Sequence, residues 1–128
     1  MVFQCTDALV TLAAVDIETL VTFYTHLLKQ APAAHIPHVY TEFQLPGLRL
    51  GIFRPKETNR QEFENSAESG MSLCLEVRDL EGAIAHLTAL GYPPPGEILT
   101  ASHGREVYVY DPAGNRLILH QSGRFTRV

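Results

Sequence analysis

The sequence has 128 residues, of which 45% are hydrophobic and 19% are charged, and its formal net charge is −4. This length suits one domain with a buried core and is too short for two independent domains of usual size. The negative charge and the absence of a basic run argue against nucleic-acid binding. No apolar stretch approaches the roughly 20 residues that a membrane-spanning helix needs, so we expect no membrane partner.

The first residues, Met1 to Asp7, have neither the basic start nor the apolar core of a secretory signal. We therefore expect a cytoplasmic protein. The two cysteines, Cys5 and Cys74, are too few for a disulfide framework or a thiolate metal site, so both are expected to be reduced thiols. Cys74 lies in an apolar run, which favours its interpretation as a small core residue.

The first half of the chain predicts a strand, a helix and three more strands. The first strand is expected at 8–15, and Asp16 after it suits the N-cap of a helix, because its carboxylate can accept from the first-turn amides. Further strands are expected around 35–37 and over 39–45 and 48–53. Apolar residues recur at helical spacing in between, at Ile17, Leu20, Val21, Tyr24, Leu27 and Leu28.

The segment from Arg54 to Ser69 is polar and charged and shows no periodicity. We interpret it as a linker, which is also a candidate for a mobile flap.

The second half of the chain repeats the pattern of the first. A strand is expected at 71–77, with Asp79 as the helix N-cap and Gly91 as a C-terminal stop. Strands follow around 97–100 and over 106–110 and 116–120. Between the last two, Pro112 presets its φ for a turn and Gly114 can take positive φ. The helix between these signals carries apolar residues at Leu80, Ala83, Ile84, Leu87 and Leu90.

The two halves align on their capping aspartates, so that Asp16-Ile17-Glu18 matches Asp79-Leu80-Glu81. One strand–helix–three-strand module of this size would leave a sheet face uncovered, so two modules are expected to cover each other. The sequence therefore predicts a single α+β domain of two βαβββ modules, residues 1–128. Module 1 spans about 4–54, the linker about 55–69 and module 2 about 70–122, and a short C-terminal tail follows.

Three segments together resemble the vicinal oxygen chelate superfamily of glyoxalases, bleomycin-resistance proteins and dioxygenases. They are 15–28, with Val-Asp-Ile and Phe-Tyr-Thr-His-Leu-Leu, then 75–80, and finally 104–116, which contains Gly-Arg and Asp-Pro-Ala-Gly-Asn. The resemblance implies curved mixed sheets that enclose a cup, and a homodimer whose partner chain can complete that cup. It includes metal-dependent enzymes, and bleomycin-resistance proteins that sequester a small molecule without metal.

The resemblance also implies where metal ligands would lie, in the first and last strand of each module. Counting from the capping aspartates and the Asp-Pro turn places these four positions at Leu9, Gly51, Ser72 and Ile118. Leucine, glycine and isoleucine side chains cannot bind a metal, and neutral serine is a poor ligand. We therefore expect neither a metal nor another cofactor at this site.

Two alternatives for a metal remain open. His120 lies two residues beyond Ile118 and Glu76 four beyond Ser72, so a displaced site using them is conceivable. His35 and His38 have a spacing that can grip a metal, although such surface pairs are more often incidental.

Strand alternation predicts which side chains enter the cup. The opposite parity holds Val10, Leu12, Leu50, Ile52, Leu73, Leu75, Leu117 and Leu119, all suited to packing beneath the helices. Gln44 shares the cup parity. The residues expected to bind a ligand are Thr11, Tyr40, Glu42, Arg49, Phe53, Ser72, Cys74, Glu76, Tyr108, Tyr110, Arg116 and His120.

The two arginines have two interpretations. Arg49 and Arg116 can simply pair with Glu42 and Glu76, because a charge in a cavity needs a partner. Alternatively, one of them remains available for a small anionic or polar ligand, with tyrosines to stack on it. His103, in the loop before the Gly104-Arg105 strand, is a further candidate for the rim of the cup.

Three functions follow from these features. The first is a metal-free protein that binds a small polar or aromatic molecule. The second is a lyase, isomerase or dioxygenase with a displaced metal site or none, in which His120 and Glu76 are the acid–base candidates. The third is a dimerising structural module, since the fold alone does not choose among functions.

Overall fold

The computed structural model describes residues 3–123. Contacts within the chain divide it into two compact units, with the boundary between Glu64 and Asn65. Each unit has the predicted order of one strand, one helix and three strands, and each is described by itself. A single domain therefore stays a prediction, and most of the expected C-terminal tail lies outside the described residues.

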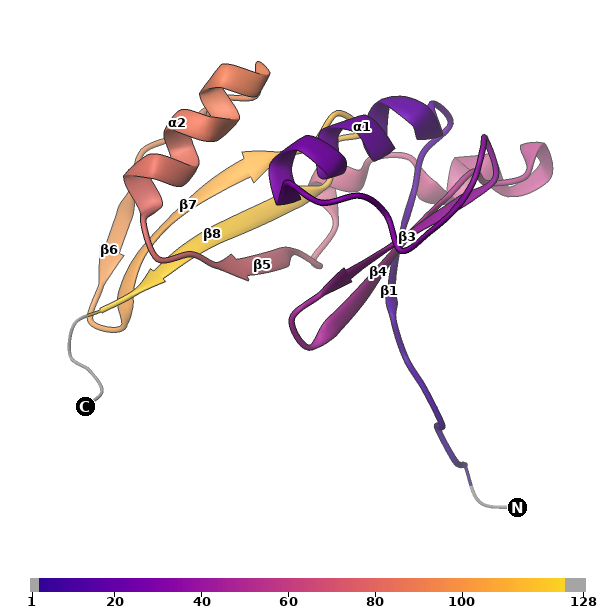
Figure 1. The fold of residues 1–128 in the computed structure, drawn as a ribbon, viewed down its shortest axis with the longest axis horizontal. Helices are drawn as coiled ribbons and strands as arrows, with labels where there is room; N and C mark the ends of the chain where they lie inside the picture. The colour runs from indigo at the N-terminus through magenta and orange to yellow at the C-terminus, as the bar shows by residue number, and fades with distance from the viewer. Residues whose placement is uncertain (1–2, 124–128) are drawn as a thin grey trace. The chain divides into compact units, whose positions relative to one another are not determined.

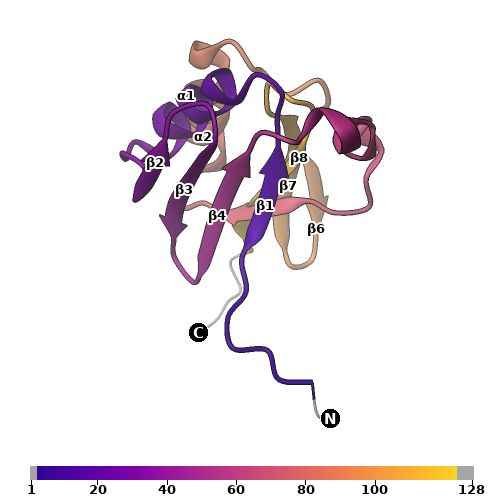
Figure 2. The same cartoon turned by 90° about the vertical axis from the view of Figure 1, so that its right-hand side faces the viewer.

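Unit 1 contains β1 (Val10–Ala13), α1 (Ile17–Leu28), β2 (Ala34–Ile36), β3 (Tyr40–Leu45) and β4 (Leu48–Phe53). Its four-stranded sheet has the order β1-β4-β3-β2, which Figure 2 shows with the strands side by side. β1 runs parallel to β4, whereas the β2–β3 and β3–β4 pairs are antiparallel. The sheet is thus mixed, as the family resemblance implies.

Unit 2 contains β5 (Leu73–Glu76), α2 (Leu80–Leu90), β6 (Leu99–Ala101), β7 (Gly104–Tyr110) and β8 (Arg116–Ser122). Its sheet has the order β5-β8-β7-β6, with β5 parallel to β8 and the other pairs antiparallel. Figure 1 shows α2 along one face of this sheet, leaving the other face uncovered within the unit. The two sheets therefore share one topology, which confirms the internal repeat.

Both helices begin where the sequence predicts. Asp16 accepts a hydrogen bond from the Thr19 amide at 3.3 Å, and Asp79 accepts one from the Gly82 amide at 3.0 Å. α2 ends at Gly91, which has a φ of 97° and closes the last turn. Asp and Gly in these positions satisfy backbone groups that the ends of a helix leave unpaired.

The core of each unit lies between the helix and one face of its sheet. In unit 1 the ring centroids of Tyr24 and Phe43 lie 6.4 Å apart, and both side chains are fully buried. The predicted inward parity is confirmed most clearly on the central strands. The buried strand residues on this parity include Thr41, Phe43, Leu45, Leu50, Ile52, Leu73, Val107, Val109, Leu117 and Leu119.

The segment predicted as a linker contains two short 3₁₀ helices, η1 (Glu57–Phe63) in unit 1 and η2 (Ser66–Glu68) in unit 2. The sequence shows no periodicity there and does not predict them. Phe63 packs edge-on against Phe53 of β4, with 5.3 Å between ring centroids. The part before Asn65 is therefore tied to unit 1. Its role as a mobile flap stays a prediction.

The Asp-Pro-Ala-Gly-Asn turn between β7 and β8 is held by Asp111. This buried carboxylate accepts hydrogen bonds from the amides of Ala113 and Asn115 at 2.9 and 3.0 Å, and from the Asn115 side chain. Gly114 takes a φ of 88°, as its place in the turn predicts. The turn fixes the register in which β8 returns along β7.

Candidate functional site

The face of each sheet opposite to its helix carries the side chains that the sequence assigned to a ligand. We call these surfaces open face A, in unit 1, and open face B, in unit 2. The strand register brings their members together, because residues paired across neighbouring strands point to the same side. Open face A consists of Thr11, Tyr40, Glu42, Arg49 and Phe53, and open face B of Ser72, Cys74, Glu76, Tyr108, Tyr110, Arg116 and His120.

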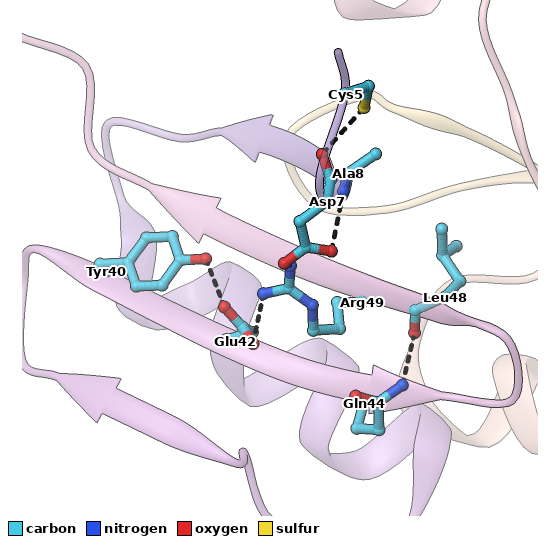
Figure 3. A network of polar contacts seen from close by, with 8 residues as sticks. All are labelled: Cys5, Asp7, Ala8, Tyr40, Glu42, Gln44, Leu48 and Arg49. Carbon is cyan, nitrogen blue, oxygen red and sulfur yellow. Dashed lines mark hydrogen bonds and ion pairs between the residues drawn. The ribbon is translucent and has the colours of Figure 1, made fainter.

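Open face A holds a network centred on Arg49, shown in Figure 3. The guanidinium donates to Glu42 at 3.2 Å and also binds Asp7, which precedes β1. The hydroxyl of Tyr40 donates to the other oxygen of Glu42 at 2.8 Å. Hydrogen bonds from Tyr40 and Arg49 hold the pKa of Glu42 below its usual range. Arg49 is thus neutralised by two carboxylates.

Tyr40 also occupies the space next to Gly51, one of the four positions at which the family resemblance predicts a metal ligand. A Cβ added to Gly51 would lie 2.6 Å from the Tyr40 hydroxyl oxygen, which is closer than real contacts allow. Partial burial is the main reason that the pKa of this hydroxyl is raised. A side chain that could reach a metal from position 51 is therefore excluded unless Tyr40 moves.

Arg116 on open face B has different surroundings from Arg49, although the two occupy matching places in their sheets. Its Nε donates to the hydroxyl of Ser72 at 2.6 Å. Its terminal nitrogens donate to the backbone carbonyls of Ala67, Ser69 and Met71. Within residues 3–123, these neutral oxygens are its hydrogen-bond partners and no carboxylate pairs with it.

The predicted pairing of both arginines is therefore half right. Arg49 pairs with Glu42, but Arg116 does not pair with Glu76. The register explains the difference: Arg116 lies opposite Tyr110, whereas Glu76 lies opposite His120, four residues farther along β8. At about 3.3 Å per residue the two are about 13 Å apart along the strand, too far for an ion pair.

The other end of open face B carries a chain of three hydrogen-bonded side chains. Glu76 contacts the Nδ1 of His120 at 2.6 Å, and the Nε2 of His120 contacts the Nδ1 of His103 at 3.1 Å. The two imidazole rings are stacked with centroids 5.2 Å apart. The second oxygen of Glu76 accepts from the amide and hydroxyl of Ser122, each at 2.7 Å.

These contacts keep Glu76 ionised. Partial burial acts to raise its pKa, but the hydrogen bonds from His120 and Ser122 prevail and hold the pKa below its usual range. The sequence predicts Glu76 and His120 as ligand-binding residues, whereas it indicates His103 only as a candidate for the rim. The β6–β7 turn brings His103 to His120 across 17 positions, a closure that no local pattern indicates.

Two other residues near the open faces were missed. Asp7 binds Arg49 from a segment before β1 that carries no secondary-structure signal. Glu106 pairs across the ladder with His120 and shares the parity of Tyr108, so strand alternation would have found it.

The prediction that Cys74 is a core residue is wrong: it is exposed, because its parity points away from α2. Burial is the main cause of the raised pKa of its thiol, and Glu106 and Glu76 add to it.

The described residues contain no group of three or more His, Cys, Asp or Glu side chains arranged to hold a metal ion. At the family positions, Gly51 is covered by Tyr40 and Ser72 is bound by Arg116. His35 and His38 both lie near the carboxylate of Glu18 on α1. The distances are 4.0 Å from His35 Nε2 to Oε1 and 3.8 Å from His38 Nδ1 to Oε2. None of the alternatives considered for a metal thus gains a third ligand within residues 3–123.

A depression of about 620 Å³ lies at the β6–β7–β8 end of unit 2. Two of its lining residues, Arg105 and Gln121, have the opposite parity and contact the start of α2. The guanidinium of Arg105, in its wall, donates two parallel hydrogen bonds to the carboxylate of Glu81, at 2.6 and 2.9 Å. Gln121 in its wall accepts from the amide of Leu80 and so anchors the helix. These contacts hold α2 on the sheet, and the open faces remain the better candidates for a ligand.

Comparison with known proteins agrees with this arrangement. A family model for a glyoxalase-like domain matches residues 9–120. The chain belongs to the glyoxalase-like family. It is therefore a member of the vicinal oxygen chelate superfamily, as its sequence motifs predict, with an α+β fold that contains two mixed sheets. Among the described residues of this glyoxalase-like protein, no helix is long and apolar enough to cross a membrane.

Solved structures resemble the glyoxalase-like chain over nearly its whole length. A glyoxalase-related enzyme from Fulvimarina pelagi is 22% identical, with a TM-score of 0.73 and coverage of 92% of this chain and 89% of that one. Lactoylglutathione lyase from Agrobacterium tumefaciens is 20% identical, with a TM-score of 0.70 and coverage of 91% and 94%. A bleomycin resistance determinant encoded on the transposon Tn5 is 19% identical, with a TM-score of 0.68 and coverage of 94% and 100%.

These likenesses show a common fold, and they include both a lyase and a resistance protein. No curated protein matches the sequence significantly. The choice between binding and catalysis therefore depends on the side chains of the open faces.

Proposed function

We propose that this glyoxalase-like protein binds a small organic anion with an aromatic part, and that it does so without a metal. The observation that carries the proposal is the state of Arg116, which is held in place by neutral oxygens and lacks a carboxylate partner within residues 3–123. A guanidinium that is oriented but not neutralised is suited to a carboxylate ligand. Of its five N–H groups, four donate to Ser72, Ala67, Ser69 and Met71, and within residues 3–123 the fifth, on Nη1, is left for a ligand oxygen.

The neighbours of Arg116 support an aromatic ligand. Tyr110 lies directly opposite it, and Tyr108 lies opposite Ile118 one step farther along the same face. Tyr108 is exposed and Tyr110 is half-buried, so their rings are accessible for stacking. Aromatic rings beside a cation form the kind of surface that planar organic acids bind.

Arg49 is a poorer candidate for the anion. Asp7 and Glu42 already bind it, and a ligand carboxylate would have to displace one of them and leave it without its partner. The contrast between the two arginines supports placing the ligand on open face B, with a structural part for open face A.

The metal-free half of the proposal is supported by the four family positions, which carry Leu9, Gly51, Ser72 and Ile118. Leucine, glycine and isoleucine offer no donor atom, and the hydroxyl of Ser72 is engaged by Arg116. Elemental analysis of protein purified without chelators tests this half. A divalent ion at one per chain, whose removal lowers the melting temperature, would contradict it.

A thermal-shift screen of substituted benzoates tests the anion half, because a ligand that binds only the folded state raises the melting temperature. We expect benzoates to stabilise the wild type and their methyl esters to have no effect. Arg116→Gln should abolish the response. Arg105→Gln is the matched control, since Arg105 is bound to Glu81 on the opposite parity. Equal responses of the two variants would refute the assignment of Arg116.

A second candidate function is enzymatic, and the Glu76–His120–His103 chain favours it. Lyases and isomerases need a positioned base, and a histidine oriented by a carboxylate is a common one. A lyase or isomerase activity lost in His120→Gln, with ligand binding retained, would favour this candidate over simple binding.

We also propose that the protein forms a homodimer, as the family resemblance implies and as two-fold assemblies commonly do. Light scattering coupled to size exclusion measures the mass directly. A monomer at micromolar concentration would exclude the dimer and, with it, the third interpretation as a dimerising module.

A further inference from the structure

The three hydrogen-bonded side chains at the end of open face B have a fixed direction. Glu76 accepts two hydrogen bonds from Ser122, and its remaining contact is the 2.6 Å bond to His120 Nδ1. A carboxylate can only accept, so His120 carries a proton on Nδ1. In a neutral imidazole the other nitrogen is then an acceptor, which leaves the Nε2 of His120 with a lone pair.

The same reasoning determines the state of His103. Its Nδ1 lies 3.1 Å from the Nε2 of His120, which accepts, so the Nδ1 of His103 must donate. The Nε2 of His103 is then an unprotonated nitrogen. His103 is exposed, and within residues 3–123 no protein group hydrogen-bonds this atom. The main-chain carbonyl of His103 accepts from the Gly123 amide at 2.8 Å, which anchors its turn beside the end of β8.

We propose that His103 presents its Nε2 as an oriented proton acceptor for a ligand with a weakly acidic hydroxyl, such as a phenol, and that His120 and Glu76 are positioning residues. The ligand hydroxyl donates to Nε2. When its proton transfers, the O–H bond breaks, the oxygen keeps the electron pair, and an N–H bond forms on Nε2. No other reactant is needed. The positive charge on His103 is then stabilised through His120 by the Glu76 carboxylate.

The charged and titratable groups around this acceptor support the assignment. Glu106 on β7 lies opposite His120, and Cys74 on β5 lies two residues before Glu76 on the same face. Glu106 and Glu76 supply negative charge at this end of the face, and the Cys74 thiol is neutral because burial raises its pKa. Among the described residues of open face B, the cation is Arg116, four residues away along β8.

The acceptor rests on the proposed function and deepens it, because a ligand with a phenol at one end and an acid at the other, long enough to span the roughly 13 Å between Arg116 and His120, would meet both groups. It is nevertheless testable in the ligand-free protein. Long-range proton–nitrogen NMR spectra of the labelled imidazoles report which nitrogen of each histidine carries the proton. We expect His103 and His120 both to be protonated on Nδ1. A His103 protonated on Nε2 would overturn the proposal.

The ligand class is tested with 4-nitrophenol, whose phenolate is yellow, against 4-nitroanisole, which lacks the hydroxyl. We expect 4-nitrophenol to bind more tightly and with the phenolate absorbance enhanced, and we expect His103→Gln to remove that difference. His26→Gln, at an exposed position on α1, is the matched control. If 4-nitrophenol binds the wild type no more tightly than 4-nitroanisole, the assigned ligand class is wrong.

The variant Glu76→Gln tests whether Glu76 orients the two histidines or only contributes to the stability of the fold. An amide can present its N–H to His120 and reverse the chain of hydrogen bonds, so we expect the Nδ1 preference of His103 to be lost in a folded variant. An unchanged tautomer would refute the role of Glu76. A failure of the proposed anion site can be distinguished from a failure of this proposal. In that case benzoates would give no melting-temperature shift that depends on Arg116, while the tautomer and 4-nitrophenol results for His103 would be as expected.

Discussion

The hydroxyl oxygen of Tyr40 lies 2.6 Å from the position that a Cβ atom on Gly51 would take. It therefore occupies the space that a side chain at position 51 would need. The sequence motifs predict a family ligand position at Gly51, and the structure fills the space beside it with an aromatic ring that is itself tied to Glu42. The relationship can be tested by returning a side chain to position 51.

Gly51→Ala is expected to lower the free energy of unfolding by about 1–3 kcal/mol, because the methyl group overpacks against Tyr40. The backbone at Gly51 does not require glycine, since its φ is not positive, so space is the cause. Urea denaturation of Gly51→Ala alone and in a Tyr40→Ala background gives a double-mutant cycle. We expect the cost to disappear in that background, and strict additivity would contradict the packing argument.

Asp111→Ala is expected to destabilise the protein by about 1–3 kcal/mol, because the amides of Ala113 and Asn115 lose their buried acceptor. Asp111→Asn keeps one acceptor oxygen and should cost less. Thermal and urea unfolding of both variants measure the difference. Equal losses would indicate that the negative charge, and not the hydrogen-bonded turn, is what matters.

The Glu81–Arg105 contact should make stability depend on acid. Arg105 lowers the pKa of Glu81 from 4.5 to about 2 in the folded protein. A depressed pKa means that the contact stabilises the fold fully above pH 4.5 and that this contribution is lost as the pH falls toward 2. Glu81→Gln should therefore melt below the wild type at neutral pH and approach it near pH 2.

Melting temperatures measured from pH 7 downward would show this convergence. Glu97→Gln, in the exposed loop before β6, is the control and should run parallel to the wild type. A gap between wild type and Glu81→Gln that stays constant with pH would mean that the contact contributes nothing to folding, as many exposed ion pairs do.

Arg116→Gln should loosen the chain around η2, because the carbonyls of Ser69 and Met71 lose a charged donor. We expect faster amide hydrogen exchange over residues 66–72, with β7 and β8 unchanged. Arg105→Gln should leave that segment unaffected. Exchange at the same rate in Arg116→Gln and the wild type would mean that other contacts hold the segment, and that Arg116 is available to a ligand at no structural cost.

The sequence by itself determined the two βαβββ units, their capped helices and the inward parity of their strands. Those features depend on local physics: an aspartate before a helix, a glycine after it, and alternation of side chains along a strand. It also determined that Leu9, Gly51 and Ile118 offer no metal ligand, because that follows from residue type alone.

Only the tertiary structure decided how the charges of the open faces are paired. Arg49 meets Asp7 across 42 positions, and His120 meets both Glu76 and His103, through loops whose closure no local pattern encodes. The sequence made Arg49 and Arg116 look equivalent, because they occupy matching places in the repeat. The fold distinguishes them, since an ion pair depends on a few ångströms in space and not on position in a repeat.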